Sequence, residues 1–78
     1  MHNILIIGAN RGLGLEFAKQ YSDENHNVFA TTRNISESKA LNAIGKIKVF
    51  ELDLNSDESL DNFVQQISSQ KIDILIHN

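Results

Sequence analysis

The sequence contains no cysteine, which excludes disulfide bonds and thiolate metal sites. Lysine and arginine contribute only seven scattered residues, and with ten aspartates and glutamates the net charge is −3, so no basic patch for nucleic acid is present. Long hydrophobic runs are also missing, since the longest, Ile4–Ile7, is far shorter than the roughly 20 residues that span a bilayer. No basic segment precedes this run, as it would in a signal peptide, and Gly8 follows it directly. We therefore expect a cytoplasmic protein that binds neither nucleic acid nor a membrane.

The composition is otherwise that of an ordinary globular protein, with 41% hydrophobic and 22% charged residues. The 78 residues amount to about half of a usual domain, which commonly has ~100–150 residues. We therefore expect residues 1–78 to form a single, partial domain.

Short apolar runs alternate with longer stretches of helical period, which is the pattern of a parallel sheet with crossover helices. Each run is four to six residues long, and its continuous apolar character favours burial on both faces. The four predicted strands are Ile4–Ile7, Val28–Thr31, Ile47–Leu52 and Ile72–Ile76.

Three helices are predicted between these strands. The first carries one apolar stripe, formed by Leu13, Phe17, Ala18 and Tyr21. The second covers Ser36–Ile44, with Ser36 as its N-cap and Gly45 at its end. The third covers Ser56–Ser69, and Asn55 with Glu58 predicts a capping box at its start. Its apolar stripe consists of Leu60, Phe63, Val64 and Ile67.

Right-handed crossovers turn this order of elements into a truncated Rossmann fold of the α/β class. Its parallel four-stranded sheet has the spatial order 3-2-1-4, with the first two helices on one face and the third on the other. After the third strand the chain reverses the direction in which it crosses the sheet, which creates a switch point between the first and fourth strands. Ligands bind at such a point, beside the carboxyl ends of the strands.

A glycine-rich turn lies at this switch point, after the first strand and before the first helix. Gly8 allows a tight turn, Gly12 allows a phosphate to approach the backbone, and Gly14 allows close packing of helix on strand. The N-terminus of the following helix offers free N–H groups and partial positive charge. The turn is therefore interpreted as a site for the pyrophosphate of a dinucleotide.

The end of the second strand bears on the choice of dinucleotide. An NAD site commonly has an acidic residue there for the ribose 2′-OH, whereas this strand is followed by Thr32 and Arg33. Arg11, in the glycine turn, is a second cation for a 2′-phosphate. This pattern favours NADP(H) over NAD(H). It disfavours S-adenosylmethionine, another ligand of Rossmann folds, for which an acid at this strand end would be expected.

The GxxxGxG spacing of the turn resembles the short-chain dehydrogenase/reductase family, and the resemblance extends over the whole chain. Asp53-Leu54 is similar to the family's Asp-plus-apolar pair at the adenine, and Asn78 matches the second asparagine of its Asn-Asn-Ala-Gly motif. Residues 8–17 resemble members related to the C-factor and sniffer carbonyl reductases. Two positions depart from the family: Ile7 stands where threonine is common, and His77 replaces the first asparagine.

The resemblance implies a cofactor site and a reaction class. The phosphates would be held by Gly8, Asn10, Arg11, Gly12, Leu13 and Gly14, and the 2′ end by Thr32 and Arg33. Asp53 and Leu54 would contact the adenine, and Asn78 the ribose. The implied activity is that of a carbonyl or alcohol oxidoreductase, of which this chain is the NADP(H)-binding N-terminal portion.

Catalytic residues are not expected in this chain, because the family's Ser and Tyr-x-x-x-Lys lie further along. Tyr21 is the only tyrosine, it belongs to an apolar helical stripe, and no lysine stands four residues after it. No metal site is expected either. The alternative interpretation is a non-catalytic module for dinucleotide binding or protein association. Because the apolar fourth strand would form a sheet edge, we also expect a homo-oligomer through that strand.

Overall fold

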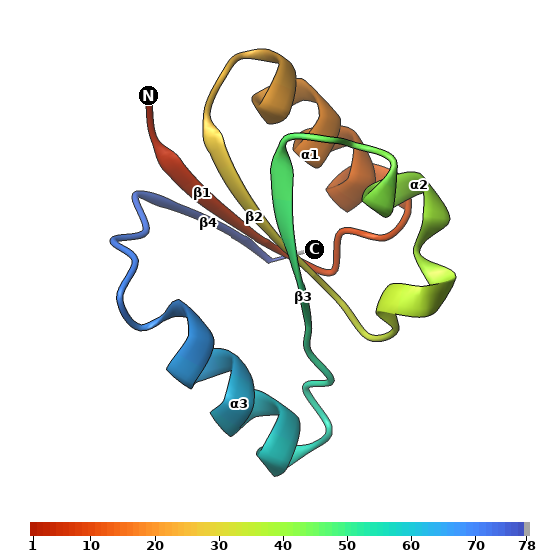
Figure 1. Ribbon diagram of the computed structural model, residues 1–78, viewed down its shortest axis with the longest axis vertical. Helices are drawn as coiled ribbons and strands as arrows, with labels where there is room; N and C mark the ends of the chain where they lie inside the picture. The colour runs from red at the N-terminus through yellow and green to blue at the C-terminus, as the bar shows by residue number, and fades with distance from the viewer. Residues whose placement is uncertain (78) are drawn as a thin grey trace.

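The computed structural model describes residues 1–77, in which four parallel strands form one sheet with the order β3-β2-β1-β4. The order predicted from right-handed crossovers is confirmed. Helices α1 (Gly12–Asp23) and α2 (Lys39–Asn42) lie on one face of the sheet and α3 (Asp57–Ile67) on the other (Figure 1). The strands are β1 (Asn3–Ile7), β2 (Asn27–Thr32), β3 (Ile47–Glu51) and β4 (Ile74–His77).

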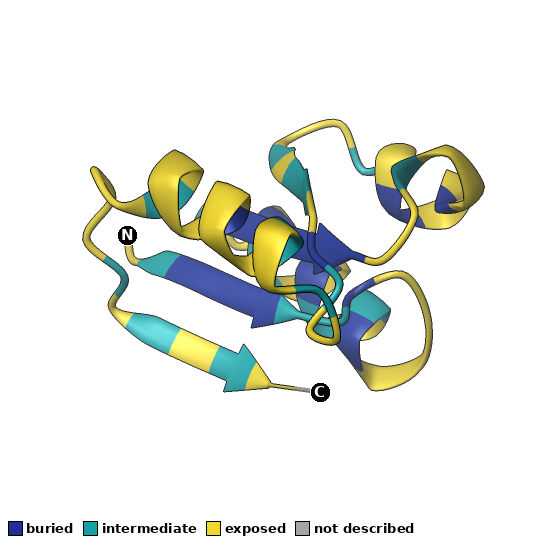
Figure 2. Cartoon of the chain, turned by 90° about the horizontal axis from the view of Figure 1, so that it is seen from below, coloured by how far each residue is buried: buried dark blue, intermediate teal, exposed yellow. Residues whose placement is uncertain are grey.

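Strand β1 is one of the two inner strands of the sheet, and β2 is the other. Ile4 aligns with Val28 on one side and with Ile74 on the other, and Ile4 and Ile6 are completely buried. Burial on both faces, predicted for every strand, therefore holds for β1 and β2, but not for the edge strand β3, whose residues are intermediate or exposed. Strand β4 instead alternates between intermediate and exposed residues, as the teal and yellow of Figure 2 show.

The fourth strand begins two residues later than predicted. Asp73, just before it, accepts a hydrogen bond from the Asn3 backbone N–H on its carboxylate (2.8 Å) and donates its own N–H to the Asn3 carbonyl (2.8 Å). Ile72 lies outside the strand and packs against the core cluster on the α3 face. The acidic residue thus fixes the start of the strand, a side-chain contact that apolar patterning could not reveal.

Helix α1 (Gly12–Asp23) covers the first face through part of its predicted stripe. Ala18 is fully buried, and Phe17 and Tyr21 are half-buried against the same core cluster. Leu13 was expected in that stripe, but it is 67% exposed. It lies in the first turn of the helix, before the residues that pack on the sheet.

The single helix predicted over Ser36–Ile44 is wrong. The structure has a 3₁₀ turn, η1 (Ile35–Glu37), followed by a short helix, α2 (Lys39–Asn42). Ser36 is not a cap: the Asn34 side chain accepts the Ser36 backbone N–H and caps η1. Ser38 interrupts the segment because its buried hydroxyl bonds the Asn34 carbonyl and the Thr32 hydroxyl, both at 2.7 Å.

Helix α3 (Asp57–Ile67) covers the opposite face, where Phe63 packs with Leu5, Phe29 and Leu52. The predicted Asn55–Glu58 capping box is wrong. Instead, Ser56 is the N-cap, and its hydroxyl accepts the Ser59 backbone N–H at 3.2 Å. The predicted stripe is only partly covered, because two of its members, Leu60 and Val64, are 38% and 50% exposed. None of the helices within residues 1–77 is long and apolar enough to cross a membrane.

Candidate functional site

The turn between β1 and α1 is held in shape by backbone geometry and by β2. Gly8 and Gly12 have positive φ angles of 82° and 62°, a region that residues with a Cβ rarely adopt. The Ala9 N–H donates to the Thr31 carbonyl at 2.9 Å, and the Gly8 N–H donates to the Thr31 hydroxyl at 3.1 Å. Thr31 therefore supplies, from the neighbouring strand, a hydroxyl contact to the turn that Ile7 cannot make.

The N-terminus of α1 opens from this turn without a side-chain cap. Arg11 is the N-cap residue, its side chain makes no capping hydrogen bond, and its carbonyl accepts the Leu15 N–H at 3.3 Å. A Cβ placed on Gly12 would meet no protein atom within 4 Å. The first turn of α1 therefore presents backbone N–H groups and partial positive charge to open space, which suits an anion.

A cavity of about 470 Å³ lies at the carboxyl ends of the strands, beside this helix start. It brings together predicted site residues from three separate parts of the chain: Gly8, Asn10, Arg11, Thr32, Arg33, Asp53 and Leu54. The position is the switch point between β1 and β4 that the topology predicts.

Some predicted residues do not line this cavity. Gly12 opens beside it, Leu13 points to solvent, and Gly14 is buried within α1. Asn78 lies outside the described residues. Sequence reasoning also missed several lining residues, each next to or within two residues of a predicted one at a strand end: Ile7, Thr31, Leu52, Asn55 and His77. Including the flanks of every strand end would have found them.

The two arginines and Thr32 differ in whether their side chains are available to contact a ligand. Arg11 and Arg33 are exposed, and no carboxylate among residues 1–77 lies within ion-pair distance of either. Thr32 is only 2% exposed, and its hydroxyl is engaged with Ser38 and with the Asn34 backbone N–H. The guanidinium groups are thus free to contact a ligand, whereas the Thr32 hydroxyl stabilises the loop that carries Arg33.

A second cavity, of about 410 Å³, adjoins the first and shares Asn10, Arg33 and Asp53 with it. Its remaining lining residues are Asn34 and Glu37. Glu37 was not predicted as a site residue, because its position in η1 depends on the chain turning back after β2. It adds a carboxylate to the neighbourhood of Arg33.

Asp53 is oriented by the start of α3. Its backbone N–H donates to the Ser59 hydroxyl at 2.9 Å, and its carboxylate accepts the Asn55 backbone N–H at 3.0 Å. These two bonds hold the Asp53 carboxylate at the cavity wall while the next side chain, Leu54, remains 52% exposed.

Comparison with known proteins agrees with this geometry. The family model described as short chain dehydrogenase matches residues 2–78. The 3-ketodihydrosphingosine reductase of Bacteroides thetaiotaomicron is 36% identical over 77 residues, which cover 96% of this chain and 27% of that protein.

Solved structures give the same result. A carbonyl reductase from Pseudomonas aeruginosa in complex with NADP is 34% identical and superposes with a TM-score of 0.88, over 100% of this chain and 38% of the other. A short-chain dehydrogenase/reductase from Burkholderia multivorans with bound NADP is 27% identical with a TM-score of 0.87, over 99% and 36% of the two chains. This chain therefore spans about a third of the length of these relatives. Together with the glycine turn and the sheet order, these matches establish that the chain belongs to the short-chain dehydrogenase family.

Proposed function

We propose that the chain binds a nicotinamide dinucleotide in the cavity at the carboxyl ends of its strands, with NADP(H) preferred to NAD(H). The observation that carries this proposal is the uncapped N-terminus of α1, which opens beside a cavity lined by Arg11 and Arg33. Two relatives of the same fold have been solved with NADP, which also supports it.

The residues present fit such a group. Gly12 leaves open space at the start of α1, where the pyrophosphate would meet backbone N–H groups. Arg33 and Arg11 would hold the 2′-phosphate, because a guanidinium can donate two charge-assisted hydrogen bonds to one phosphate. Asp53 and Leu54 would contact the adenine. Glu37 would repel the 2′-phosphate and moderate the preference rather than reverse it, since the cofactor cavity is lined by two cations, Arg11 and Arg33.

We further propose that the 78-residue chain binds the cofactor without reducing a substrate by itself. The bound nicotinamide would supply a hydride for carbonyl reduction, but that reduction also needs a proton donor in position. Tyr21 cannot serve, because it lies near the end of α1 opposite the glycine turn, with its ring packed against Phe17 and His26. Residue 25 is also asparagine rather than lysine. The chain's own residues would bind and orient the cofactor.

Titration of the chain with NADPH and with NADH tests the cofactor proposal. We expect NADPH to bind about tenfold more tightly, because a charge-assisted hydrogen bond contributes about 1.5 kcal/mol. Absolute affinity is expected in the millimolar range, or about −4 kcal/mol. Arg33→Asp should remove most of the difference by weakening NADPH alone.

Lys19→Asp is the matched control, because it makes the same charge reversal at an exposed position of α1 that does not line the cavity. It should leave the NADPH preference intact. Equal affinity of the unmodified chain for the two cofactors would contradict the proposed preference, and no binding of either would contradict the proposed function.

We also propose that the chain self-associates through β4. No strand within residues 1–77 pairs with the outer edge of β4, and the strand is apolar along Ile74–Ile76. Leu75 aligns with Leu5, so its side chain lies on the face of the sheet that α3 covers. Leu75 itself is 60% exposed. An exposed apolar edge strand is a template for pairing with another chain, most simply in a symmetric dimer.

A further inference from the structure

The opposite edge of the sheet, formed by β3, presents unpaired backbone groups. The Leu52 N–H donates to the Thr32 carbonyl at 2.8 Å, so Leu52 and Phe50 turn their backbone groups toward β2. Because successive residues of a strand alternate in this respect, the N–H and C=O groups of Val49 and Glu51 point away from the sheet. No other strand among residues 1–77 pairs with them.

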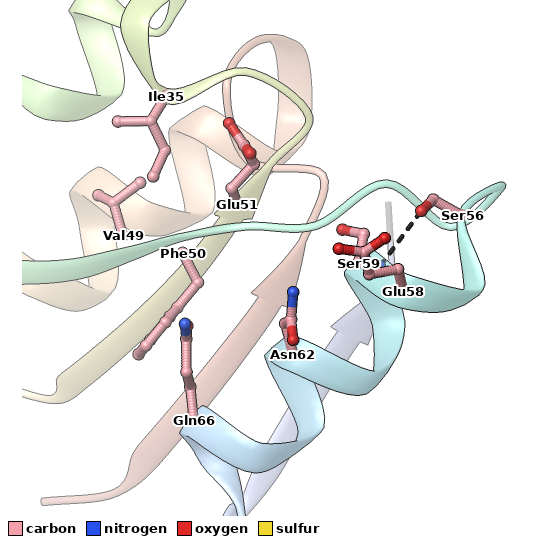
Figure 3. A pocket seen from close by; sticks show the side chains of 9 residues that line it. All are labelled: Ile35, Val49, Phe50, Glu51, Ser56, Glu58, Ser59, Asn62 and Gln66. Carbon is pink, nitrogen blue, oxygen red and sulfur yellow. Dashed lines mark hydrogen bonds between the residues drawn. The ribbon is translucent and has the colours of Figure 1, made fainter.

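A cavity of about 600 Å³ surrounds this edge, separate from the proposed cofactor site. Figure 3 shows the ribbon of β3 passing through its middle, with lining side chains on both sides. Ile35, Val49 and Glu51 lie on one side of the strand. The side chains on the other side are Phe50 of β3 and, from the start and body of α3, Ser56, Glu58, Ser59, Asn62 and Gln66. An added strand would find room for side chains on both of its faces.

The lining of this cavity changes from apolar to acidic along the strand. Toward the amino end it is apolar on both faces, with Val49 on one and Phe50 on the other. Toward the carboxyl end it is acidic on both faces, with exposed Glu51 on one and exposed Glu58 on the other. No lysine, arginine or histidine lines this cavity. The nearest basic residue of the strand, Lys48, holds its ammonium group 5.6 Å from the centre of the Phe29 ring and lines a different cavity.

We propose that the outer edge of β3 binds an extended segment of a partner protein, which adds a strand to the sheet and carries two adjacent basic residues. Neighbouring residues of a strand point to opposite faces, so one basic side chain would reach Glu51 and the next would reach Glu58. The two residues before or after them, depending on strand direction, would be apolar and contact Val49 and Phe50.

A second copy of this chain does not have that pattern. Lys48 of β3 and Lys46, just before the strand, are two residues apart and therefore share one face where the chain is extended. No two basic residues are adjacent anywhere in the sequence. The charges also protect β3 from indiscriminate pairing, because lysine on an edge strand discourages self-association. A basic partner segment thus complements the edge better than the chain itself does.

Labelled peptides test this proposal by fluorescence anisotropy on the full chain. The probes are acetyl-Ser-Val-Ile-Lys-Arg-Ser-amide and the peptide of reversed order, each with a neutral counterpart in which glutamine replaces both basic residues. One basic peptide should bind about tenfold more tightly than its neutral counterpart, since an exposed ion pair contributes up to about fivefold. This advantage should disappear at high ionic strength.

Three variants and one exchange measurement complete the test. Glu51→Gln and Glu58→Gln should each weaken basic-peptide binding about threefold, whereas Asp61→Asn, an equal charge change on α3 outside the cavity, should leave it unchanged.

Bound peptide should also protect the Val49 and Glu51 amides from hydrogen exchange. The proposal is overturned if basic and neutral peptides bind alike, if both glutamine variants bind as tightly as the unmodified chain, or if those two amides gain no protection. Protection of the same amides by dimerisation without peptide would also overturn it and assign the edge to a second copy.

Discussion

Two glycines determine the path of the backbone at the proposed cofactor site. Gly8 turns the chain out of β1, and Gly12 starts α1, both at positive φ. The left-handed conformation costs other residues roughly 1–2 kcal/mol. At Gly12 this cost is purely conformational, because an added Cβ would meet no protein atom within 4 Å.

Replacing Gly12 with alanine separates the effect of φ from that of packing. Gly12→Ala should lower the free energy of unfolding by about 1–2 kcal/mol through φ alone. Gly45→Ala is the control, since Gly45 also has open space around it but lies outside the left-handed region. It should be neutral or stabilising by up to ~1 kcal/mol. Urea titration of both variants checks this, and equal destabilisation would be inconsistent with the assigned backbone geometry.

At the scale of elements, the start of α3 links the fold to the site. Ser56 caps the helix, the Ser59 hydroxyl accepts the Asp53 N–H, and the Asp53 carboxylate accepts the Asn55 N–H. The helix cap and the cavity wall are therefore one hydrogen-bonded unit. Loosening the first turn of α3 is expected to loosen Asp53 as well.

Substitutions at this cap distinguish the observed capping residue from the one that the sequence pattern favours. Ser56→Ala should cost about 1 kcal/mol, because it removes the hydroxyl that accepts the Ser59 N–H. Asn55→Ala should lower the free energy of unfolding by only a few tenths of a kcal/mol, since within residues 1–77 Asn55 forms a hydrogen bond through its backbone N–H and none through its side chain. Thermal or urea unfolding gives the comparison. A larger loss of unfolding free energy for Asn55→Ala than for Ser56→Ala would show that Asn55 is the cap.

The whole molecule is a sheet with a buried centre and two different edges. Strand β3 carries Lys46, Lys48 and Glu51 along or beside its edge, whereas the apolar part of β4 carries no charge. Leu60 and Val64 are also exposed, on the helix that packs on the same face of the sheet as Leu75. The β4 side of the molecule is thus the side from which water is most favourably removed.

Self-association through β4 can be tested with a lysine substitution that leaves the core intact. Leu75→Lys is suitable because Leu75 is exposed, whereas Ile74 packs against the α1 face of the core. Sedimentation at micromolar concentration should show dimers of the unmodified chain and a shift toward monomer in Leu75→Lys. Leu13→Lys changes another exposed leucine, which belongs to α1 and not to the edge of the sheet, and should have no effect. A stable monomer of the unmodified chain would refute the association.

Catalytic competence is also a property of the whole chain. NADPH should not be oxidised in the presence of a panel of aldehydes and ketones, because acid–base groups typically contribute ~10²–10⁴-fold and no Tyr-x-x-x-Lys is present. The absorbance of NADPH at saturating chain concentration provides the measurement. Turnover proportional to the chain, retained after stringent purification, would show that other residues supply the proton.

Much of the fold was predictable because its determinants are local or topological. Apolar runs of strand length, helical periodicity around Phe63, and the right-handed crossover are enough to predict four strands and their order. Strand ends were less predictable, since the start of β4 depends on the contact of Asp73 with Asn3, 70 residues away in sequence.

The sequence by itself determined the glycine turn, the sheet order and the absence of an acid after β2, because these depend on residue type and on spacing along the chain. Only the tertiary structure decided that Thr31 supplies the hydroxyl to the turn, that Glu37 lies beside Arg33, and that Leu13 faces solvent. These outcomes depend on which strand lies next to which and on where each helix begins relative to the sheet. Contacts between residues far apart in sequence arise only when the sheet has formed. Hydrophobic periodicity and secondary-structure propensity therefore cannot predict them.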